Sequence, residues 1–252
     1  METVELYLNS KAARIRGDTS DCYFTLPTIT TMPDEQAFIS VKNAVLPYSW
    51  YNISDTNNTL LVEIASIEYT LKLSAGNYTA LTLASELQNL FALGSFAFTV
   101  SYISKTNRYD FKYSNDFVFK NSGSTCFELL GLSAQDHYSL VTIGTRILQS
   151  NISINLFVNR QLLLLSDNFI LSNISASASS NRNILCSIPV TGNPTSMIHY
   201  SSTAQHLIHH TTNLNALHVR IVSDDNTPIN LNGCHWSACL AITFAPKNNI
   251  VP

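Results

Sequence analysis

The sequence predicts an all-β protein with a smaller α+β part, in which a jelly-roll β-sandwich carries an inserted β-β-α-β-β subdomain. Two observations predict this fold class. Short apolar runs separated by turn residues recur along most of the chain, as is typical of sandwiches and jelly rolls. One amphipathic helix interrupts them near the middle of the chain, and the sequence on both sides of the interruption predicts strands alone.

The first predicted strands lie before residue 53. The run from Cys22 to Leu26 is β-prone, and Pro27 is expected to end it because proline donates no backbone hydrogen bond. The run from Ala37 to Leu46 has apolar residues on a period of two, so one of its faces is expected to be buried. Pro47 ends this second strand.

An aromatic cluster of Tyr48, Trp50 and Tyr51 follows. Aromatic rings carry a large apolar area, and packing in a core or at a domain junction is the preferred interpretation. The alternative that the sequence leaves open is a ligand platform, on which these rings stack against sugars.

The predicted α+β part begins with two strands, Leu60–Ile64 and Tyr69–Leu73. A helix follows, with Thr79 as its N-cap and Gly94 in the position of a C-terminal cap. The apolar stripe of this helix has the spacing of one helix face and consists of Leu83, Leu87, Leu90 and Phe91.

Two more strands, Phe96–Ile103 and Arg108–Tyr113, come after the helix, and a hairpin loop at residues 105–107 joins them. The run Phe117–Phe119 continues the pattern. Cys126–Leu132 is expected to form a short helical turn that ends at Gly131. Residues 53–148 are therefore expected to form one α+β unit.

The rest of the chain is predicted to be all-β. Turns are expected at residues 192–194 and 224–226, and a loop rich in Ser, Ala and Asn at residues 175–183. The predicted strands around these turns are Ile152–Val158, Leu162–Leu165, Phe169–Ile174, Ile184–Val190, Met197–Tyr200, Gln205–His209, Leu217–Val222 and Trp236–Phe244.

The predicted domain organisation is nested. Residues 1–52 and 149–252 form the jelly roll, and the α+β unit of residues 53–148 is inserted between two of its strands. Insertion is physically easy because chain ends lie close together in many domains. A tandem of two separate domains is the alternative that the sequence leaves open.

The scarcity of charge indicates an assembly component. Charged residues make up 12% of the chain and the formal net charge is −3, whereas an average domain has about 25% charged residues. Asn, Ser and Thr take the polar positions instead, and neutral groups are buried against a neighbour at a lower cost than ions. The composition gives no sign of the basic face that nucleic-acid-binding domains carry.

Five cysteines are scattered along the chain without a C-x-x-C pair: Cys22, Cys126, Cys186, Cys234 and Cys239. This odd number and spacing fit reduced thiols in a cytosolic setting better than a disulfide framework. The acidic first residues lack the apolar segment of a signal peptide, and the most apolar run, Leu162–Leu165, is too short to span a bilayer. We therefore expect neither secretion nor a membrane span.

The sequence supplies no motif for catalysis. It lacks a nucleophile elbow and a glycine-rich phosphate loop. The acidic pairs Asp34-Glu35 and Asp224-Asp225 lie beside turn residues, which explains them without acid–base chemistry. We expect no catalytic, cofactor-binding or metal-binding residues and no enzymatic activity.

Histidines are nevertheless concentrated near the C-terminus. Together with two cysteines they are of the types that bind zinc: His199, His206, His209, His210, His218, His235, Cys234 and Cys239. Their spacing fits no zinc template, so loop or interface histidines are the preferred interpretation. Interface histidines would make an assembly loosen on protonation near pH 6.

Two stretches carry a resemblance to a known family. The first stretch consists of Leu73-x-x-Gly76-x-Tyr78, Phe98-x-Val100-x-Tyr102, Tyr109-x-Phe111 and Leu129-Leu130-Gly131. The second stretch consists of Val219-Arg220-Ile221, Asp224-Asp225, Ile229–Gly233 and Trp236-Ser237. From about Ala37 to Phe244, the chain resembles the penton or minor capsid proteins of virophages, Polinton-like viruses and related large DNA viruses.

The resemblance implies a structural protein of the virion, made in the host cell cytoplasm. It implies a jelly-roll subunit that forms homo-pentamers at icosahedral vertices and contacts the major capsid protein and other shell proteins. The inserted domain is the expected place for a receptor or fibre contact. An N-terminal arm, Met1–Ser20, is expected to reach a neighbouring subunit or the particle interior, where Lys11, Arg14 and Arg16 would touch nucleic acid or an internal protein.

Three alternatives stay open at this point. The first is a minor capsid protein elsewhere in the shell, and the second is a carbohydrate- or receptor-binding jelly-roll module. The third is a metal-dependent jelly-roll enzyme.

Overall fold

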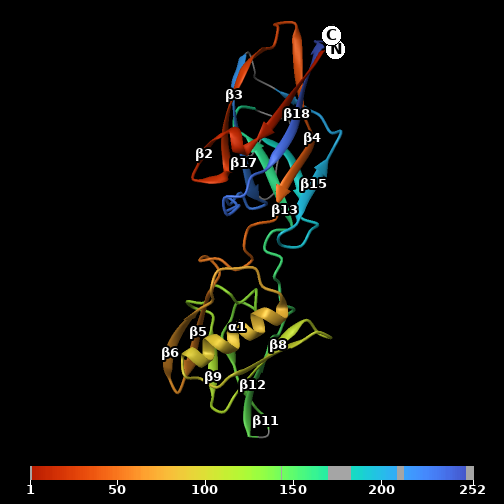
Figure 1. The fold of residues 1–252 in the computed structure, drawn as a ribbon. Helices are drawn as coiled ribbons and strands as arrows, with labels where there is room; N and C mark the ends of the chain where they lie inside the picture. Colours follow the sequence, from red (N-terminus) through yellow and green to blue (C-terminus); the bar gives the residue numbers. More distant parts are fainter. Residues whose placement is uncertain (1, 143, 170–182, 209–212, 248–252) are drawn as a thin grey trace. The chain divides into compact units, whose positions relative to one another are not determined.

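Figure 1 shows a computed structural model of the protein, which describes residues 2–142, 144–169, 183–208 and 213–247. The contacts within the chain divide it into two compact units. The first unit combines Met1–Trp50 with Asn159–Pro252, and the second unit is Tyr51–Val158. The expectation that residues 53–148 fold as a separate insertion stays a prediction.

In its described part, the first unit consists of two antiparallel sheets. The first sheet has the order β1 (Glu2–Asn9), β18 (Ser237–Pro246), β4 (Glu35–Pro47) and β15 (Met197–Ser201), and β16 (His206–Ile208) also pairs with β4. The second sheet has the order β14 (Ile184–Pro189), β13 (Gln161–Ser166), β17 (Asn213–Ser223), β3 (Asp18–Thr30) and β2 (Arg14–Arg16).

The strand pairing in this unit is that of a jelly roll. The first strand pairs with the last, β1 with β18. The pairing then moves inward along the chain, joining β3 to β17, β4 to β15 and β13 to β14. Two further pairings, β4 with β18 and β13 with β17, join these pairs side by side into the two sheets. This is the topology of a long hairpin rolled into a sandwich, and it confirms the predicted fold class.

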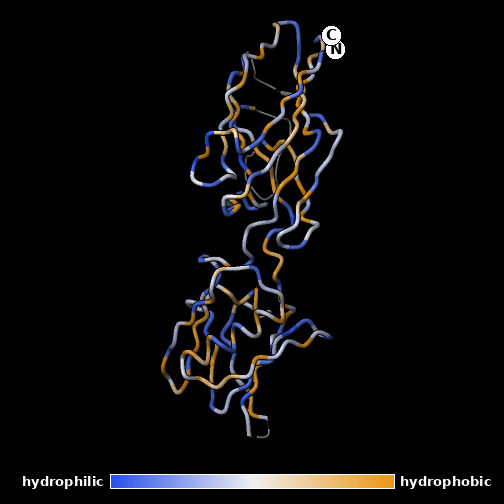
Figure 2. The backbone as a smooth tube through the Cα atoms, viewed as in Figure 1, coloured by the Kyte–Doolittle hydropathy of each residue, from blue (hydrophilic) through white to orange (hydrophobic). Residues whose placement is uncertain are grey.

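The core of the first unit is built from every second residue of its strands. Ile39 and Val41 of β4 and Leu217 and Val219 of β17 are at most 2% exposed. Figure 2 shows the alternation of hydrophobic and hydrophilic residues along the strands. This period of two is the signal on which the sequence prediction rests.

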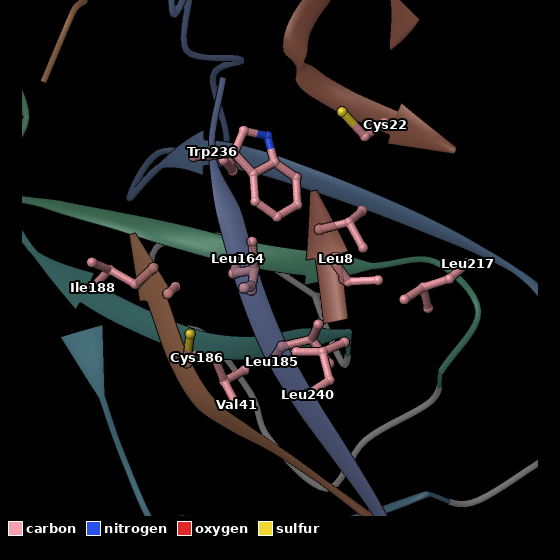
Figure 3. Close-up of a cluster of buried hydrophobic side chains, with 14 of the residues drawn as sticks. Leu8, Cys22, Val41, Leu164, Leu185, Cys186, Ile188, Leu217, Trp236 and Leu240 are labelled. Carbon is pink, nitrogen blue, oxygen red and sulfur yellow. The ribbon is translucent and has the colours of Figure 1, made fainter. Parts of the chain in front are cut away.

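Trp236, just before β18, anchors one end of this core. It is 2% exposed, and its indole N–H donates a hydrogen bond to the carbonyl of Thr19 over 2.7 Å. Its ring meets that of Phe24 edge-on, with the ring centroids 6.0 Å apart. Figure 3 shows Trp236 with Leu8 and Leu164, which come from different strands of the same core. The indole is thus buried with its polar group satisfied.

Over its described residues, 51–142 and 144–158, the second unit has two four-stranded sheets and one helix. One sheet has the order β10 (His137–Tyr138), β9 (Phe117–Lys120), β5 (Thr59–Ile64) and β6 (Ile67–Lys72). The other has the order β11 (Leu140–Thr142), β12 (Thr145–Gln149), β8 (Arg108–Tyr113) and β7 (Thr99–Ile103). The helix α1 is Ala80–Leu93.

The helix begins and ends where the sequence predicts. Thr79 is its N-cap and forms a capping box with Thr82, and the N–H of Gly94 donates to the carbonyl of Leu90. Its buried face consists of Leu83, Ala84, Leu87 and Phe91. The ring of Phe91 stacks on that of Phe98, with the ring centroids 4.0 Å apart, so the helix packs on an aromatic core.

The prediction that the first strand ends at Pro27 is wrong, since β3 continues to Thr30. The register of β17 against β3 shifts between Leu214 and Ala216, which leaves Leu26–Thr28 opposite a single residue. Pro27 therefore lies in a bulge, where its missing N–H breaks no regular ladder bond.

The prediction of a strand at Ile152–Val158 is also wrong, since this segment lies in no strand and belongs to the second unit. Its backbone bonds to loops instead of to a neighbouring strand. The N–H of Ile152 donates to the carbonyl of Gly131, and that of Ile154 to the carbonyl of Asn107. Ile154 is 8% exposed, whereas Ile152 and Val158 are 41% and 45% exposed, so the apolar alternation does not mark one buried face.

The prediction of an N-terminal arm is wrong in part. Glu2–Asn9 forms the strand β1, and each of its residues pairs with a residue of β18. Leu6 and Leu8 are buried in the core of the first unit. Arg14 and Arg16 lie in β2, at the edge of the second sheet. The arm is therefore built into the jelly roll over its described length.

Parts of the predicted C-terminal region lie outside the described residues. These are most of the strand Phe169–Ile174 and of the loop at residues 175–183, together with His209 of the strand Gln205–His209. In the parts of the chain that the structure describes, no helix is long and apolar enough to cross a membrane.

Candidate functional site: the outer face of the second jelly-roll sheet

The outer face of the β13–β17–β3–β2 sheet carries a cluster of charged and aromatic residues. In β17, Val219 and Ile221 are buried in the core, whereas His218 and Arg220, which alternate with them, are half-buried on the other face. The register places His218 opposite Tyr23 of β3 and Arg220 opposite Asp21. Cross-strand pairs on one face are direct neighbours, so the sheet itself assembles the cluster.

His218 is held on both of its ring nitrogens. Nε2 lies 2.7 Å from Oδ1 of Asp21, and Nδ1 lies 3.0 Å from Oδ2 of Asp167, which follows β13. The imidazole ring stacks on the ring of Tyr23, with the centroids 3.9 Å apart and the planes 5° from parallel. Both nitrogens of the imidazole ring thus lie within 3.0 Å of a carboxylate oxygen.

Arg220 completes the cluster, because its guanidinium lies 2.8 Å from Oδ1 of Asp167. Burial raises the pKa of the Asp167 carboxyl, but other interactions outweigh it and hold that pKa below its usual value. These are the hydrogen bond and charge of Arg220, the charge of His218 and the hydrogen bond from Asn183. Asp21 and Asp167 thus both lie within ion-pair distance of His218, and Asp167 also pairs with Arg220.

A groove of about 460 Å³ lies beside the cluster. It is lined by Arg14, Ile15 and Arg16 of β2, by residues 23–25 of β3 and by Ala216 of β17. Arg14 lies opposite Tyr23, so the groove and the cluster share this ring. All three residues of β2 are exposed.

The described members of the histidine and cysteine group do not come together as a metal site. Among the described residues, no group of three or more His, Cys, Asp and Glu side chains is placed to hold a metal ion. His199 is exposed in β15, and His235 accepts or donates a hydrogen bond at the hydroxyl of Ser10 over 3.1 Å. His209 and His210 lie outside the described residues.

The aromatic cluster belongs mainly to the core. The rings of Tyr48 and Trp50 stack with their centroids 4.2 Å apart, and they are 6% and 4% exposed. Tyr51 is 45% exposed. Core packing is therefore confirmed for Tyr48 and Trp50, whose faces are not free to stack on a sugar.

The two acidic pairs lie at turns, as predicted. A carboxylate oxygen of Glu35 accepts a hydrogen bond from the N–H of Met32. A carboxylate oxygen of Asp225 accepts from the hydroxyl of Ser223 and from the N–H of Thr227. The hydroxyl of Ser223 is the main reason why the pKa of Asp225 lies below its usual value. These acids stabilise turns through local hydrogen bonds.

None of the five cysteines forms a disulfide. Burial raises the pKa of the Cys22 thiol to about 11 and the pKa values of the Cys126 and Cys186 thiols to about 12. Cys239 is also buried, and Cys234 is exposed. The buried thiols are therefore protonated at neutral pH and behave as small apolar side chains.

Sequence reasoning identified only part of the outer-face cluster. It named His218 as one of a histidine group and Arg14 and Arg16 as parts of an arm, and it missed Asp21, Tyr23 and Asp167. A usable signal existed for Asp21 and Tyr23, which alternate with the buried Cys22 and so lie on the outer face. Nothing local in the sequence brings Asp167 to His218, because only the strand register does so.

The fold and this surface define a jelly-roll protein with an α+β unit between its fourth and fifth core strands, β4 and β13, and without a metal cluster among the residues described. The chain is similar in structure to the mavirus penton protein, whose crystal structure was determined with selenomethionine. The TM-score is 0.58 with 10% sequence identity over 97% of this chain and 100% of that chain. This likeness confirms the resemblance at the level of the fold.

A second similar structure comes from the Sputnik virophage, determined by cryo-electron microscopy. The TM-score is 0.45 with 11% identity over 96% of this chain and 98% of that chain. No family model matches the chain, and no curated protein matches its sequence.

Proposed function

We propose that this protein is a structural subunit of a viral capsid and, more specifically, a penton subunit that forms homo-pentamers at icosahedral vertices. The observation that carries the proposal is the whole-chain likeness to the mavirus penton protein, which includes both the jelly roll and the second unit. A match to the jelly roll alone would favour no function in particular, because that fold serves many. A match that spans both units of a nested architecture is far more specific.

The composition of the chain supports an assembly role. Subunits around a closed ring contact each other through two different surfaces, and both surfaces are covered in the assembly. Such interfaces are depleted in charge and enriched in aromatic residues. The chain has 12% charged residues and 10% aromatic residues, which suits burial of much of its exterior by copies of itself and by the major capsid protein.

The second unit is the proposed place for a receptor or fibre contact. Tyr138, Leu140 and Val141 of β10 and β11 are 65%, 71% and 67% exposed. Large apolar side chains exposed next to each other along the chain are typical of an interaction site. In this proposal the protein is found in the virion, is made in the host cytoplasm with its thiols reduced, and has no enzymatic activity and no cofactor.

The oligomeric state of the purified protein tests the proposal. Native mass spectrometry should give a species of five chains, and negative-stain images of the same sample should show rings with fivefold symmetry. A stable monomer at micromolar concentration that binds immobilised glycans would instead favour a carbohydrate-binding module. A six-fold or two-fold species would favour a minor capsid protein at another position in the shell.

A further inference from the structure

We propose that the β2 edge of the second sheet binds an extended acidic segment of a partner protein, added as a further strand with an acidic–apolar–acidic pattern. The proposed contacts are Arg14, Ile15 and Arg16. This inference does not depend on the pentamer, since it concerns one edge of one subunit.

The first argument is the open edge. Within the described residues β2 pairs with β3 alone, so the opposite edge of β2 carries backbone N–H and C=O groups with no strand beside them. Proteins commonly protect such edges, and where they do not, an extended segment can add to the sheet. β2 is short, and all of its residues are exposed, so no described part of the chain covers it.

The second argument is the charge balance. Asp21 and Asp167 are paired with His218 and Arg220 within the outer-face cluster. Asp18, at the start of β3, accepts hydrogen bonds from the backbone N–H groups of Ser20 and Leu231 and from a hydroxyl.

Arg14 and Arg16, by contrast, take part in no ion pair among the described residues. Arg16 lies opposite Asp18 in the strand register, and the two charged side chains that line the groove itself, Arg14 and Arg16, are both cationic. An anionic segment is the complementary occupant.

The third argument is the alternation along β2. Arg14 and Arg16 are two residues apart on a strand and so lie on one face, about 7 Å apart along the chain. Ile15 lies on the other face and is 40% exposed. A strand placed alongside would set carboxylates at its positions i and i+2 beside the arginines and an apolar side chain at i+1 beside Ile15.

The groove is also held in a fixed shape. Tyr23, which lines it, is stacked on His218, and both nitrogens of that ring are held by carboxylates. A surface that is already ordered loses little conformational entropy on binding. A peptide strand is favoured over nucleic acid because backbone addition and the apolar contact at Ile15 have no counterpart in a phosphate chain.

The test uses the full-length protein and short fluorescent peptides, measured by anisotropy. The probe peptide is Thr-Ser-Thr-Glu-Val-Glu-Thr-Ser-Thr, blocked at both ends. A scrambled peptide with Glu-Glu-Val at its centre has the same charge without the alternation. A peptide with Lys-Val-Lys reverses the charge, and a fluorescent oligothymidylate represents nucleic acid.

The variant pair Arg14→Gln with Arg16→Gln removes the two charges. Lys72→Gln with Lys112→Gln is the matched control, because it removes the same charge from exposed positions of the second unit. Thermal unfolding of each variant tests whether it is folded. We expect both variants to fold, because all four substituted side chains are exposed.

We expect the Glu-Val-Glu peptide to bind the wild type and the Lys variant equally, and the Arg variant about fivefold or more weakly, as two exposed ion pairs imply. An added strand donates hydrogen bonds to the sheet from every second backbone N–H. N-methylation of that set of nitrogens in the peptide should therefore abolish binding, whereas N-methylation of the other set should leave binding unchanged. The proposal is overturned by equal binding of the scrambled peptide, by insensitivity to the Arg substitutions or to N-methylation, or by no binding of the probe. Preferential binding of oligothymidylate through the same arginines would overturn it in favour of nucleic acid.

Discussion

Gly131 lies so close to the backbone of Ile152 that a Cβ atom added to the glycine would be 2.5 Å from the carbonyl oxygen of Ile152. Gly131 also has a φ of +70°, which L side chains rarely adopt. Its own carbonyl accepts a hydrogen bond from the N–H of Ile152. This contact ties the irregular segment at residues 152–158 to the rest of the second unit.

Gly131→Ala should therefore destabilise the second unit by about 2–4 kcal/mol, the sum of the left-handed backbone conformation and the forced displacement of a packed segment. Urea unfolding followed by far-ultraviolet circular dichroism measures the loss, because both tryptophans, Trp50 and Trp236, belong to the first unit. Gly144→Ala is the matched control: Gly144 has a φ of +77° with nothing within 4 Å of an added Cβ. That variant should lose about 1 kcal/mol. Equal losses in the two variants would show that the close contact with Ile152 has no energetic weight.

The same contact explains one limit of the sequence analysis. Residues 152–158 alternate between apolar and polar residues, as a strand does. They contact Gly131 instead, and a contact with a residue about twenty positions earlier cannot be recognised from the local sequence pattern. The opposite error occurred at the N-terminus, where an arm was expected and a strand is found. Leu6 and Leu8 have the period of a strand, and they belong to β1 and to the buried core. The jelly roll itself was predictable, because each long strand carries its own alternation. The outer-face cluster was not, since it depends on the register between β17 and β3.

The hairpin between β5 and β6 stores backbone strain that substitution should release. Its two turn residues, Ala65 and Ser66, have φ values of 51° and 63°, in the left-handed region. Two-residue hairpin turns of this kind favour Asn-Gly because other residues adopt positive φ at a cost. The double variant Ala65→Asn with Ser66→Gly should raise the free energy of unfolding by about 1–2 kcal/mol.

Thermal and urea unfolding measure this gain in the second unit. Ala92→Asn with Ser85→Gly, on the exposed face of α1, introduces the same residue types in a helix and should destabilise it. An unchanged or lowered stability of the turn variant would mean that Ala65 and Ser66 are held in place by contacts that outweigh the strain.

Asp167 should contribute to stability in a pH-dependent way. Its pKa in the folded protein lies below its usual value, so its contribution is present above the unfolded pKa of about 3.9 and is lost as the pH falls through the lowered folded value. The side chain is 43% exposed, which limits the contribution to about 0.5–1 kcal/mol after screening. Asp167→Asn should therefore cost this amount at pH 6 and almost nothing at pH 2.5.

Urea unfolding of the wild type and the variant at both pH values measures the difference. Asp55→Asn, at an exposed position, removes the same charge and serves as the control. If Asp167→Asn loses the same stability at both pH values, its effect comes from packing and not from the charge on its carboxyl.

The cysteines should react with thiol reagents very unequally. Burial raises the pKa values of Cys22, Cys126 and Cys186, and only the thiolate is nucleophilic. Cys234 is exposed. At pH 8 the native protein should therefore release one equivalent of chromophore from a disulfide reagent, and five equivalents after unfolding in denaturant.

Cys234→Ser identifies the fast thiol and should leave the native protein almost unreactive. Fast reaction of two or more thiols in the native wild type would show that one of the buried cysteines becomes accessible by local opening. Persistent reaction in the variant would assign the fast thiol to another position.

The division of the chain into two compact units makes the strongest prediction about folding. The buried core of the jelly roll and the buried core of the second unit share no residue. Every strand pair of the jelly roll is likewise formed by strands outside Tyr51–Val158. Each unit therefore has the apolar burial that a domain needs to fold alone.

Two pieces test this directly: Tyr51–Val158 expressed by itself, and the remaining chain with a short Gly/Ser linker in place of those residues. Each piece should unfold cooperatively, and amide exchange should protect the same strands as in the full chain. We expect the linker to be tolerated, because the entropic cost of closing a loop depends only weakly on the length of the loop. If Tyr51–Val158 folds while the joined jelly roll stays unfolded, the jelly roll depends on the second unit for its folding and is not an independent host for an insertion.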